Sequence, residues 1–396
     1  MLCPADEAAL AGLVAGAHAA GEPMLVEGAG TKRGMLRPVQ AARSISTRGL
    51  TGATLYAPKE LVFSARSGTR VRDVEAMLAG EGQHLIAEPP DYAALLGTVP
   101  DTQTLGGVVA TNLSGPRRVM SGAVRDHVLG MRVVDGTGAV MRAGGRVLKN
   151  VTGLDVCKLV AGSHGTLGVM TEITLKVLPA PEATGSLVLS GLDAARGVAA
   201  LSAALGSPYG VSGAAFLPAE AACRLGYGTS ATLVRIEEFA DSVTYRLGRL
   251  REVWCNFGEM VVLDDAASRD AWSAIRDAAV LPAGEEEAVW RISVRPSRGP
   301  SMLAAAAACG GRGYLDWGGG LAMLAAPATE AAHAALTGAA RAAGGVWTLL
   351  RAPEPMRAAV DVVPGEAAPL RRIGQKVKAT MDPRGILNPG RIFAGM

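Results

Sequence analysis

The sequence predicts an α+β protein built from two domains. A chain of 396 residues is longer than one hydrophobic core usually supports, so two cores are expected. The hydrophobic fraction of 49% and the charged fraction of 19% are typical of a well-buried globular chain. In the second half, strand-like runs alternate with helical stretches, which is typical of a sheet covered by helices. These runs are 187–189, 232–236, 290–294 and 321–325.

The first elements follow from local periodicity. Residues 5–20 predict a helix, because Leu10, Leu13, Val14 and Ala17 recur at helical spacing behind an acidic first turn. Next come an apolar run at 24–26, strands at 54–57 and 62–65, and a helix at 71–79 that ends at Gly80. The segment 89–122 is dense in turn residues yet apolar in places, which predicts an ordered loop.

A hairpin and a half-buried strand complete the first half. Residues 132–135 and 139–143 flank Gly136-Thr137-Gly138, a signal typical of a β-hairpin. Residues 171–178 alternate polar and apolar side chains, as a half-buried strand does. The run Pro179-Ala180-Pro181-Glu182 breaks both helix and strand, so the domain boundary is placed there.

Composition excludes several classes of function. A net charge of +3 without a Lys/Arg-rich block, and only 4% aromatic residues, argue against nucleic-acid binding. The five cysteines form no Cys-x-x-Cys pair, which excludes a zinc ribbon or an iron–sulfur cluster held by this chain alone. No metal site is expected. Scattered cysteines predict reduced thiols in a cytoplasmic protein. The sequence contains no uninterrupted apolar run of about 18 residues, so no membrane span is expected.

Glycine is the informative excess, at 51 of 396 residues, and much of it falls in clusters before residue 170. The first cluster is Gly28-Ala29-Gly30-Thr31-Lys32-Arg33-Gly34. It fits neither the Rossmann fingerprint, because its third glycine falls one residue late, nor a Walker A loop. What remains is a strand that enters a turn of small residues. The turn's amides either point at a pyrophosphate or belong to an ordinary tight turn.

Two further clusters allow a close approach of backbone to a ligand. Residues 104–115 combine paired glycines with Thr111, Asn112 and Ser114, which offer hydrogen bonds to a flat ring system. The alternative is a buried loop that satisfies its own polar groups. Residues 161–170 place three glycines at three-residue spacing just before a strand. The alternative there is a turn into an edge strand.

Together and in this order, the three clusters resemble the FAD-binding domain of the vanillyl-alcohol-oxidase family, also called the PCMH type. The stretches Arg125–Gly130 and Lys149–Asp155 add to the resemblance. The ending Met381–Arg391 is similar to that of members that oxidise 2-hydroxy acids. Within the family, the chain most closely resembles the FAD-binding E subunits of bacterial glycolate oxidases. The resemblance is dense over 20–182 and 370–393.

This resemblance implies the arrangement of the chain. It implies a PCMH-type FAD-binding domain of two subdomains at 1–182 and a smaller α+β cap domain at 183–350. Residues 351–396 would then return to the FAD domain. It also implies a non-covalent flavin, because the first loop contains neither His nor Cys, and neither Cys157 nor His127 matches a known attachment motif.

The resemblance also implies the residues that bind FAD. Gly28, Ala29, Gly30, Thr31 and Lys32 would hold the pyrophosphate. Thr104, Leu105, Gly106, Gly107, Thr111, Asn112 and Ser114 would line the pyrophosphate and the isoalloxazine. Gly122 and Arg125 would lie near the ring, Gly165, Thr166, Gly168 and Val169 at the adenine and ribose, and Asn388 would return towards the ring. Ala29 departs from the all-glycine form of the loop, and its methyl is tolerable only if φ is not positive.

No catalytic residue is assigned. Oxidation of a 2-hydroxy acid needs a base, usually His, and stand-alone relatives carry a His-rich motif and a metal in the second half. This chain lacks that motif, and beyond the boundary it has only His333, which is expected to be an ordinary surface residue of a helix. Arg291 and Arg351 remain candidates for carboxylate binding, with surface or ion-pair roles as the favoured interpretation.

The resulting hypothesis is an accessory redox subunit that holds one FAD. It would exchange electrons with a second FAD-binding glycolate oxidase subunit and an iron–sulfur subunit, and the complex would act on a small 2-hydroxy acid. The complex could lie at the inner membrane. One rival is a stand-alone FAD-dependent lactate or glycolate dehydrogenase. The other is a scaffold subunit that has lost its flavin.

Overall fold

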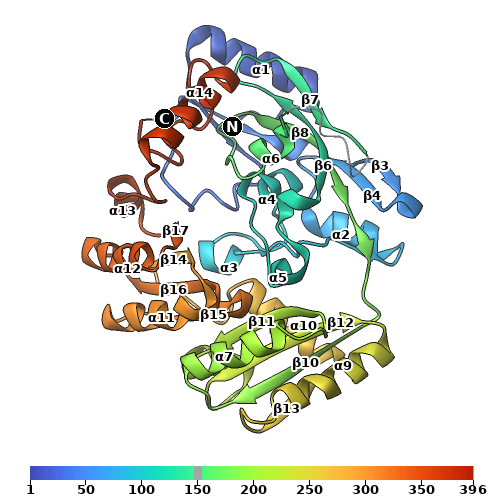
Figure 1. Cartoon of the computed structure of the whole chain (residues 1–396). Helices are drawn as coiled ribbons and strands as arrows, with labels where there is room; N and C mark the ends of the chain where they lie inside the picture. Colours follow the sequence, from blue (N-terminus) through green and yellow to red (C-terminus); the bar gives the residue numbers. More distant parts are fainter. Residues whose placement is uncertain (147–153, 396) are drawn as a thin grey trace. The chain divides into compact units, whose positions relative to one another are not determined.

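The computed structural model describes residues 1–146 and 154–395 (Figure 1). The chain separates into two compact units. Unit 1 comprises Met1–Ser114, Ala123–Ala180 and Gly365–Met396, and unit 2 comprises Gly115–Gly122 and Pro181–Pro364. The stretch Lys149–Gly153 of the sequence resemblance lies outside the described residues.

Unit 1 is built on a five-stranded antiparallel sheet with the strand order β3-β4-β8-β6-β7. Its strands are β3 (Ala53–Ala57), β4 (Val62–Arg66), β6 (Val128–Val134), β7 (Val140–Gly144) and β8 (Val169–Lys176). Two strand pairs flank it: the parallel pair β1 (Met24–Glu27) and β2 (Arg43–Ser46), and β5 (Gln83–His84) with β9 (Leu178–Pro179). The helices are α1 (Glu7–Ala20), α2 (Val71–Ala79), α3 (Ala93–Leu96), α4 (Leu105–Thr111), α6 (Val156–Val160) and α14 (Ala368–Met381).

The predicted first helix is confirmed as α1, and its ends have clear causes. The Asp6 side chain accepts a hydrogen bond from the Ala9 amide at 2.8 Å, which satisfies one of the free amides of the first turn. Gly21 ends the helix at φ 67°, a conformation that glycine adopts without strain. Leu10 and Val14 are fully buried, as their helical spacing predicted.

The interpretation of 89–122 as loop is wrong for part of its length, because the segment contains α3, α4 and α5 (Arg118–Ser121). Paired glycines disfavour a helix, but Leu105, Val108 and Val109 bury an apolar stripe in the core of unit 1. The Thr104 hydroxyl caps the helix by accepting from the Gly107 amide at 3.3 Å. Tertiary burial therefore overrides the local preference.

The alternative of an edge strand after the third cluster is also wrong. Strand β8 lies inside the sheet, paired with β4 on one side and β6 on the other. Most of its side chains are buried, and the Thr174 hydroxyl lies 2.8 Å from the Ser64 hydroxyl of β4. The loop at 161–168 thus leads into the centre of unit 1.

Unit 2 contains an eight-stranded antiparallel sheet with the order β13-β10-β12-β11-β15-β16-β14-β17. The strands are β10 (Ala183–Ser190), β11 (Val211–Leu217), β12 (Ala231–Glu238), β13 (Met260–Leu263), β14 (Glu287–Ser293), β15 (Arg312–Asp316), β16 (Leu321–Pro327) and β17 (Val346–Arg351). The helices are α7 (Ala194–Leu205), α8 (Ala219–Ala222), α9 (Ala240–Val253), α10 (Asp265–Arg276), α11 (Gly299–Ala308), α12 (Glu330–Ala342) and α13 (Glu354–Ala359).

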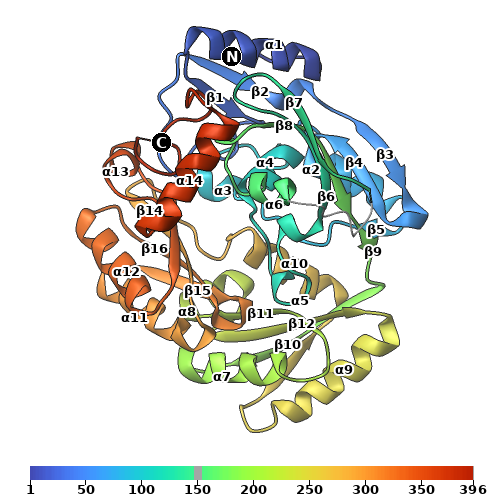
Figure 2. The same ribbon diagram turned by 45° about the horizontal axis from the view of Figure 1, so that its top comes forward.

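The helices of unit 2 lie on both faces of this sheet. Helices α7 and α9 pack on one face, where Gly197 of α7 leaves room for Phe216 and Gly185 of β10 leaves room for Leu247 (Figure 2). Helix α10 packs on the other face, where Trp272 lies over Gly213. Its indole donates to the Ser186 hydroxyl at 2.8 Å. A sheet covered by helices is therefore confirmed.

The limits of the units differ from the predicted domains at three places, one of which is small, since unit 2 begins at Pro181 rather than at 183. Strand β17 pairs with β14, so residues 351–364 belong with unit 2 and the return to unit 1 begins at Gly365 rather than at 351. Residues 115–122 also belong to unit 2. In the described part of the chain, no helix is both long and apolar enough to cross a membrane.

The C-terminal segment is tied into unit 1 by a buried carboxylate. Asp382 is buried, accepts from Lys378 at 2.7 Å, and accepts from the amides of Ile386 and Leu387 at 3.1 and 2.8 Å. Leu387 in turn forms a parallel bridge with Met24 of β1. One carboxylate therefore shapes the turn that brings the chain end to the first strand.

We expect Asp382→Ala to lower the free energy of unfolding of unit 1 by about 3 kcal/mol, since it leaves two amides without an acceptor and removes the carboxylate that neutralises the largely buried Lys378 ammonium. Urea denaturation followed by circular dichroism measures this. The matched control is Asp73→Ala, which removes an exposed partner of Arg70 and is expected to cost less than about 0.5 kcal/mol. Equal effects of the two substitutions would show that the Asp382 carboxylate does not hold the C-terminal segment in unit 1.

Candidate functional site

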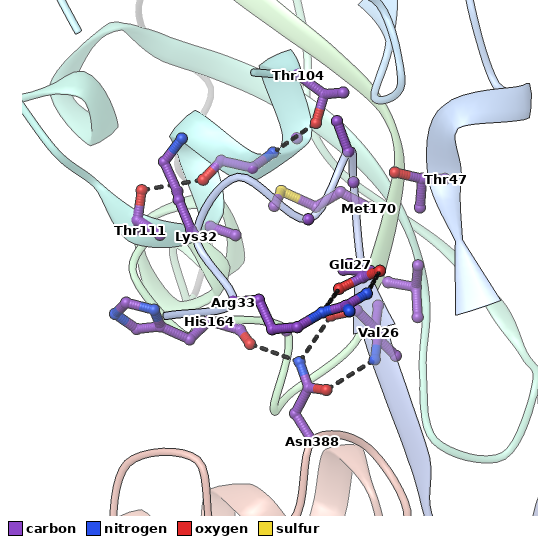
Figure 3. A pocket seen from close by; sticks show the side chains of 18 of the residues that line it. Val26, Glu27, Lys32, Arg33, Thr47, Thr104, Thr111, His164, Met170 and Asn388 are labelled. Carbon is purple, nitrogen blue, oxygen red and sulfur yellow. Dashed lines mark hydrogen bonds and ion pairs between the residues drawn. The ribbon is translucent and has the colours of Figure 1, made fainter. Parts of the chain in front are cut away.

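Unit 1 contains an open cavity with about 760 Å³ of empty space, part of which is open solvent. Its wall is made by the first loop, the start of α4, the 164–170 segment and the chain end (Figure 3). The sequence-predicted residues that line it are Gly28, Ala29, Gly30, Thr31, Lys32, Thr104, Gly106, Gly107, Thr111, Gly165, Gly168, Val169 and Asn388. The three glycine clusters and the chain end are thus brought to one cavity.

The first loop presents unused amides. Among the described residues, the backbone amides of Ala29, Gly30, Thr31 and Lys32 have no hydrogen-bond acceptor. Gly30 has φ 78°, whereas Ala29 does not have a positive φ. The methyl group of Ala29 is therefore accommodated without backbone strain. A turn with successive free amides is a typical binding site for an anion.

Both ends of this loop are held. Arg33 makes a two-pronged ion pair with Glu27, with Nε–Oε2 3.0 Å and Nη2–Oε1 2.5 Å, which closes the loop at its base. From the chain end, buried Arg391 donates to the carbonyls of Lys32 at 2.7 Å and Arg37 at 3.0 Å. The loop is therefore shaped before any ligand arrives.

The second cluster lies directly against the first loop. A Cβ on Gly28 would lie 2.1 Å from the Thr104 Oγ1, so the two segments meet without room for a methyl group. The Gly106 amide donates to the Ser67 carbonyl at 2.7 Å, and the Gly107 amide to Thr104. These glycines provide close approach, and the free amides of the cavity come from the first loop.

The third segment is held in place from the chain end. His164 and Gly165 have φ of 54° and 72°. Buried Asn388 donates to the His164 carbonyl at 2.8 Å and the Val26 carbonyl at 3.0 Å, and accepts from the Val26 amide at 2.7 Å (Figure 3). Both donor hydrogens of Asn388 are engaged with backbone, so this residue acts by positioning β1 and the 164–165 turn.

The cavity favours a negatively charged ligand. Burial lowers the pKa of Lys32 from 10.5 to about 8, partly offset by the negative charge of Asp91. Burial also lowers the pKa of His164 to about 3, helped by the positive charges of Arg391 and Lys32. At neutral pH Lys32 is therefore the titrating cation of the cavity, while His164 is neutral.

Six predicted residues do not line the cavity: Leu105, Asn112, Ser114, Gly122, Arg125 and Thr166. Two of them join backbone segments instead. Asn112 Oδ1 accepts from the Arg125 amide at 3.0 Å, and the Ser114 hydroxyl accepts from the Val124 amide at 3.0 Å. Leu105 is buried in the core, Thr166 donates to the Ser163 carbonyl, and Gly122 belongs to unit 2.

Several lining residues were not predicted: Leu25, Val26, Glu27 as a side chain, Arg33, Thr47, Ala110, His164, Met170 and Arg391. Arg33 and His164 lie inside the quoted glycine clusters, so a closer look at the titratable side chains of those clusters would have found them. Thr47 follows β2 and carries no motif that points to it.

Two residues considered for other roles are structural. His333 is buried rather than on the surface, which corrects the expectation, and its Nδ1 accepts from the Trp290 indole at 3.1 Å. Burial lowers the pKa of His333. Cys157 is buried outside the cavity lining, and burial raises the pKa of its thiol to about 11. In residues 1–146 and 154–395, no three His, Cys, Asp or Glu side chains are grouped to hold a metal.

Comparison with known proteins decides the family. Residues 1–144 match the FAD binding domain family FAD_binding_4. The chain is 35% identical over 374 residues to the glycolate oxidase subunit GlcE of Escherichia coli K12, covering 94% of this chain and 93% of that protein. The chain belongs to the GlcE family of FAD-linked oxidoreductases. Its cofactor is therefore FAD, and relatives in this group act on CH–OH groups.

More distant relatives match a part of the chain in sequence or nearly the whole chain in fold. The glycolate oxidase subunit GlcD of Bacillus subtilis is 38% identical over 109 residues, which cover 27% of this chain and 22% of GlcD. The structure of p-cresol methylhydroxylase covers 99% of this chain and 88% of its own, with a TM-score of 0.72 at 13% identity. The 4-ethylphenol oxidase of Gulosibacter chungangensis gives a TM-score of 0.71 at 14% identity. The predicted PCMH-type α+β fold is confirmed.

We expect Gly28→Ala to lower the flavin content of the purified chain at least tenfold, because the methyl group would collide with Thr104. The variant Gly28→Ala/Thr104→Ala removes the colliding hydroxyl and is expected to regain part of the flavin. Absorbance at the flavin band relative to protein measures occupancy. Gly16→Ala, where no described atom lies within 4 Å, is the matched control. Wild-type occupancy in the single variant would show that the cavity is not the flavin site.

Proposed function

We propose that the cavity of unit 1 binds FAD with its pyrophosphate on the first loop. The observation that carries this proposal is the set of free amides at Ala29–Lys32 beside the Lys32 ammonium. Amides and a cation together match the two negative charges of a pyrophosphate. Thr104, Gly106, Gly107 and Thr111 would then line the pyrophosphate and isoalloxazine, and Gly165, Gly168 and Val169 the adenine and ribose.

The flavin in this proposal is non-covalent. The lining residues include no cysteine, and their one histidine is His164, whose backbone is fixed by Asn388 and by a bond from its amide to the Ala110 carbonyl at 2.9 Å. Acid precipitation is expected to release all flavin into the supernatant. Flavin that stays with the pellet would contradict non-covalent binding and would point to His164.

The functional proposal is a subunit of a multi-subunit glycolate oxidase that converts glycolate to glyoxylate. Its support is the 35% identity to GlcE over 94% of the chain, since the name of GlcE describes a subunit. A shorter match to GlcD, over 27% of the chain, adds to this support. The chain would hold one FAD and relay electrons with a second FAD-binding subunit and an iron–sulfur subunit. Its own residues would contribute cofactor binding and orientation, while bound FAD accepts electrons from a CH–OH group. The complex could lie against the inner membrane.

The test of this function separates flavin binding from turnover. The chain is purified alone and with its co-expressed partners, and glycolate oxidation is followed with an artificial acceptor. We expect one FAD per chain in both preparations, iron only in the second, and turnover only in the second. Turnover of glycolate or lactate by the chain alone would support a stand-alone dehydrogenase, and a colourless chain that takes up no FAD would support a scaffold.

The proposed pyrophosphate site makes flavin affinity dependent on pH. Because the pKa of Lys32 is about 8, the ammonium is mostly charged at pH 7 and mostly neutral at pH 9. The dissociation constant of FAD is expected to rise by about tenfold over this interval if the charged form is needed. Fluorescence titration of the flavin-free chain measures it. Lys32→Gln should bind weakly with a flat profile, and Lys59→Gln, an exposed lysine, should retain the wild-type profile.

A further inference from the structure

A second cavity lies within unit 2, at one end of its sheet. Because neighbouring strands are antiparallel, β10 and β11 end where β12 and β15 begin, and Ser190 and Leu217 both pair with Ala231. The loops at this end, together with α7, α8, α11 and residues 280–282, enclose about 530 Å³ of space that water can enter (Figure 2). This volume is within the range of small-molecule sites, about 300–1,000 Å³.

The floor of the cavity is apolar and belongs to the core of unit 2. Phe216, Val280 and Leu281 line the cavity, and each is at most 2% exposed. Helix α11 contributes Ala304 and Ala307, whose short side chains leave the space above this floor unfilled. A concave apolar surface that is open to water is typical of a site that takes the apolar part of a ligand.

The backbone around the cavity is fixed by the fold. Helix α10 gives way to the cavity wall through Ala278, whose φ is 57°, and the Tyr314 hydroxyl of β15 donates to the Ile275 carbonyl at 2.9 Å. On β15, Gly313 lines the cavity, and a Cβ there would lie 2.4 Å from the Met323 carbonyl oxygen. The walls therefore take their shape without a ligand.

Most charged groups at the cavity already have partners. Arg312 donates to Glu287 at 2.5 and 2.9 Å and to the Pro282 carbonyl at 2.5 Å, and it forms an ion pair with Glu220 at 3.1 Å. The bond from Arg312 lowers the pKa of Glu287 against the opposing effect of burial, and the positive charge of Arg351 adds to the lowering. Two carboxylates thus face two guanidinium groups, and the cluster is balanced.

Arg224 is the charged group at the cavity that is left for a ligand. Asp193 is engaged, because its carboxylate accepts from the Arg196 amide at 2.8 Å and caps α7. Arg224 lies in the turn after α8, lines the cavity and is exposed. Within residues 1–146 and 154–395 it makes no hydrogen bond or ion pair. An apolar chamber is therefore combined with one guanidinium that has all its donors available.

We propose that this cavity binds an amphipathic carboxylic acid, with its apolar part on the Phe216 floor and its carboxylate at Arg224. A guanidinium matches a carboxylate in shape and in charge. The apolar part leaves water on binding, whereas the carboxylate stays at the open side and keeps its hydration. The site lies in unit 2 alone and does not rest on the flavin site of unit 1.

The test is calorimetric titration of the purified full-length chain with octanoate, octanol and octylamine, each below the concentration at which it forms micelles. We expect saturable binding of octanoate, binding of octanol at least fivefold weaker, and no saturable binding of octylamine. Arg224→Gln should weaken octanoate about fivefold and leave octanol unchanged. Ala304→Trp and Ala307→Trp fill the chamber and should weaken both ligands at least tenfold. The matched control is Ala199→Trp, at an exposed position of α7 outside the lining, which should bind as the wild type does.

Four outcomes would overturn the proposal. They are the absence of saturable octanoate binding, equal binding of octylamine, wild-type affinity in Ala304→Trp and Ala307→Trp, and wild-type octanoate affinity in Arg224→Gln. Loss of octanoate binding in the complex with co-expressed subunits would also overturn it, because a protein partner would then occupy the cavity. The melting temperature of each variant shows whether lost binding reflects unfolding. Flavin content should be unchanged in all variants, so a failure here is distinguishable from a failure of the flavin site.

Discussion

The geometry of the unit 1 cavity depends on the last residues of the chain bonding back to the first strand. Asn388 joins β1 to the turn at 164–165, and Arg391 holds carbonyls of the first loop from Lys32 onwards. Strand β1 and the first loop are more than a hundred residues from the 164–165 turn, and two side chains of the chain end hold all three segments. Both side chains are buried, so each broken bond would leave a polar group without water. The cavity is consequently a property of the whole unit rather than of any one glycine loop.

Burying the Lys32 ammonium in the cavity lowers the stability of unit 1, and a bound anion would offset this loss. Burial disfavours the charged form of Lys32, and burial together with two neighbouring cations keeps His164 neutral. A buried lysine without an anion lowers stability, and its pKa falls until the cost is limited. A pyrophosphate on the neighbouring amides would reverse this effect. The lowered pKa of Lys32 and the free amides of the first loop thus have the same cause, which is that no anion lies beside them.

Local sequence patterns predicted many of the strands, helices α1 and α2, and the glycine clusters of the cavity, because those features depend on near neighbours. Helix α4 was missed because its stability comes from burying Leu105 and Val109, which outweighs the paired glycines. Asn112 and Ser114 were assigned to the ligand, but their side chains bond to the amides of Arg125 and Val124. A hydrogen-bonding side chain in a glycine-rich segment serves the backbone or a ligand equally well, and only the tertiary contacts distinguish the two. For the same reason Arg391 was recognised only as the end of the C-terminal stretch, because its partners lie more than 350 residues away.

The two arginines of unit 2 show how far residue type alone can mislead. Arg291 and Arg351 lie on the paired strands β14 and β17, and both follow or interrupt apolar runs. A register shift between Val289 and Trp290 separates their surroundings, so Arg351 reaches a backbone carbonyl while Arg291 reaches an indole. The guanidinium of Arg291 packs on the Trp317 ring, and its buried Nε has no hydrogen-bond partner within the described part of the chain. The surroundings of these two arginines are therefore set by strand register, just as the shape of the unit 1 cavity is set by the return of the chain end.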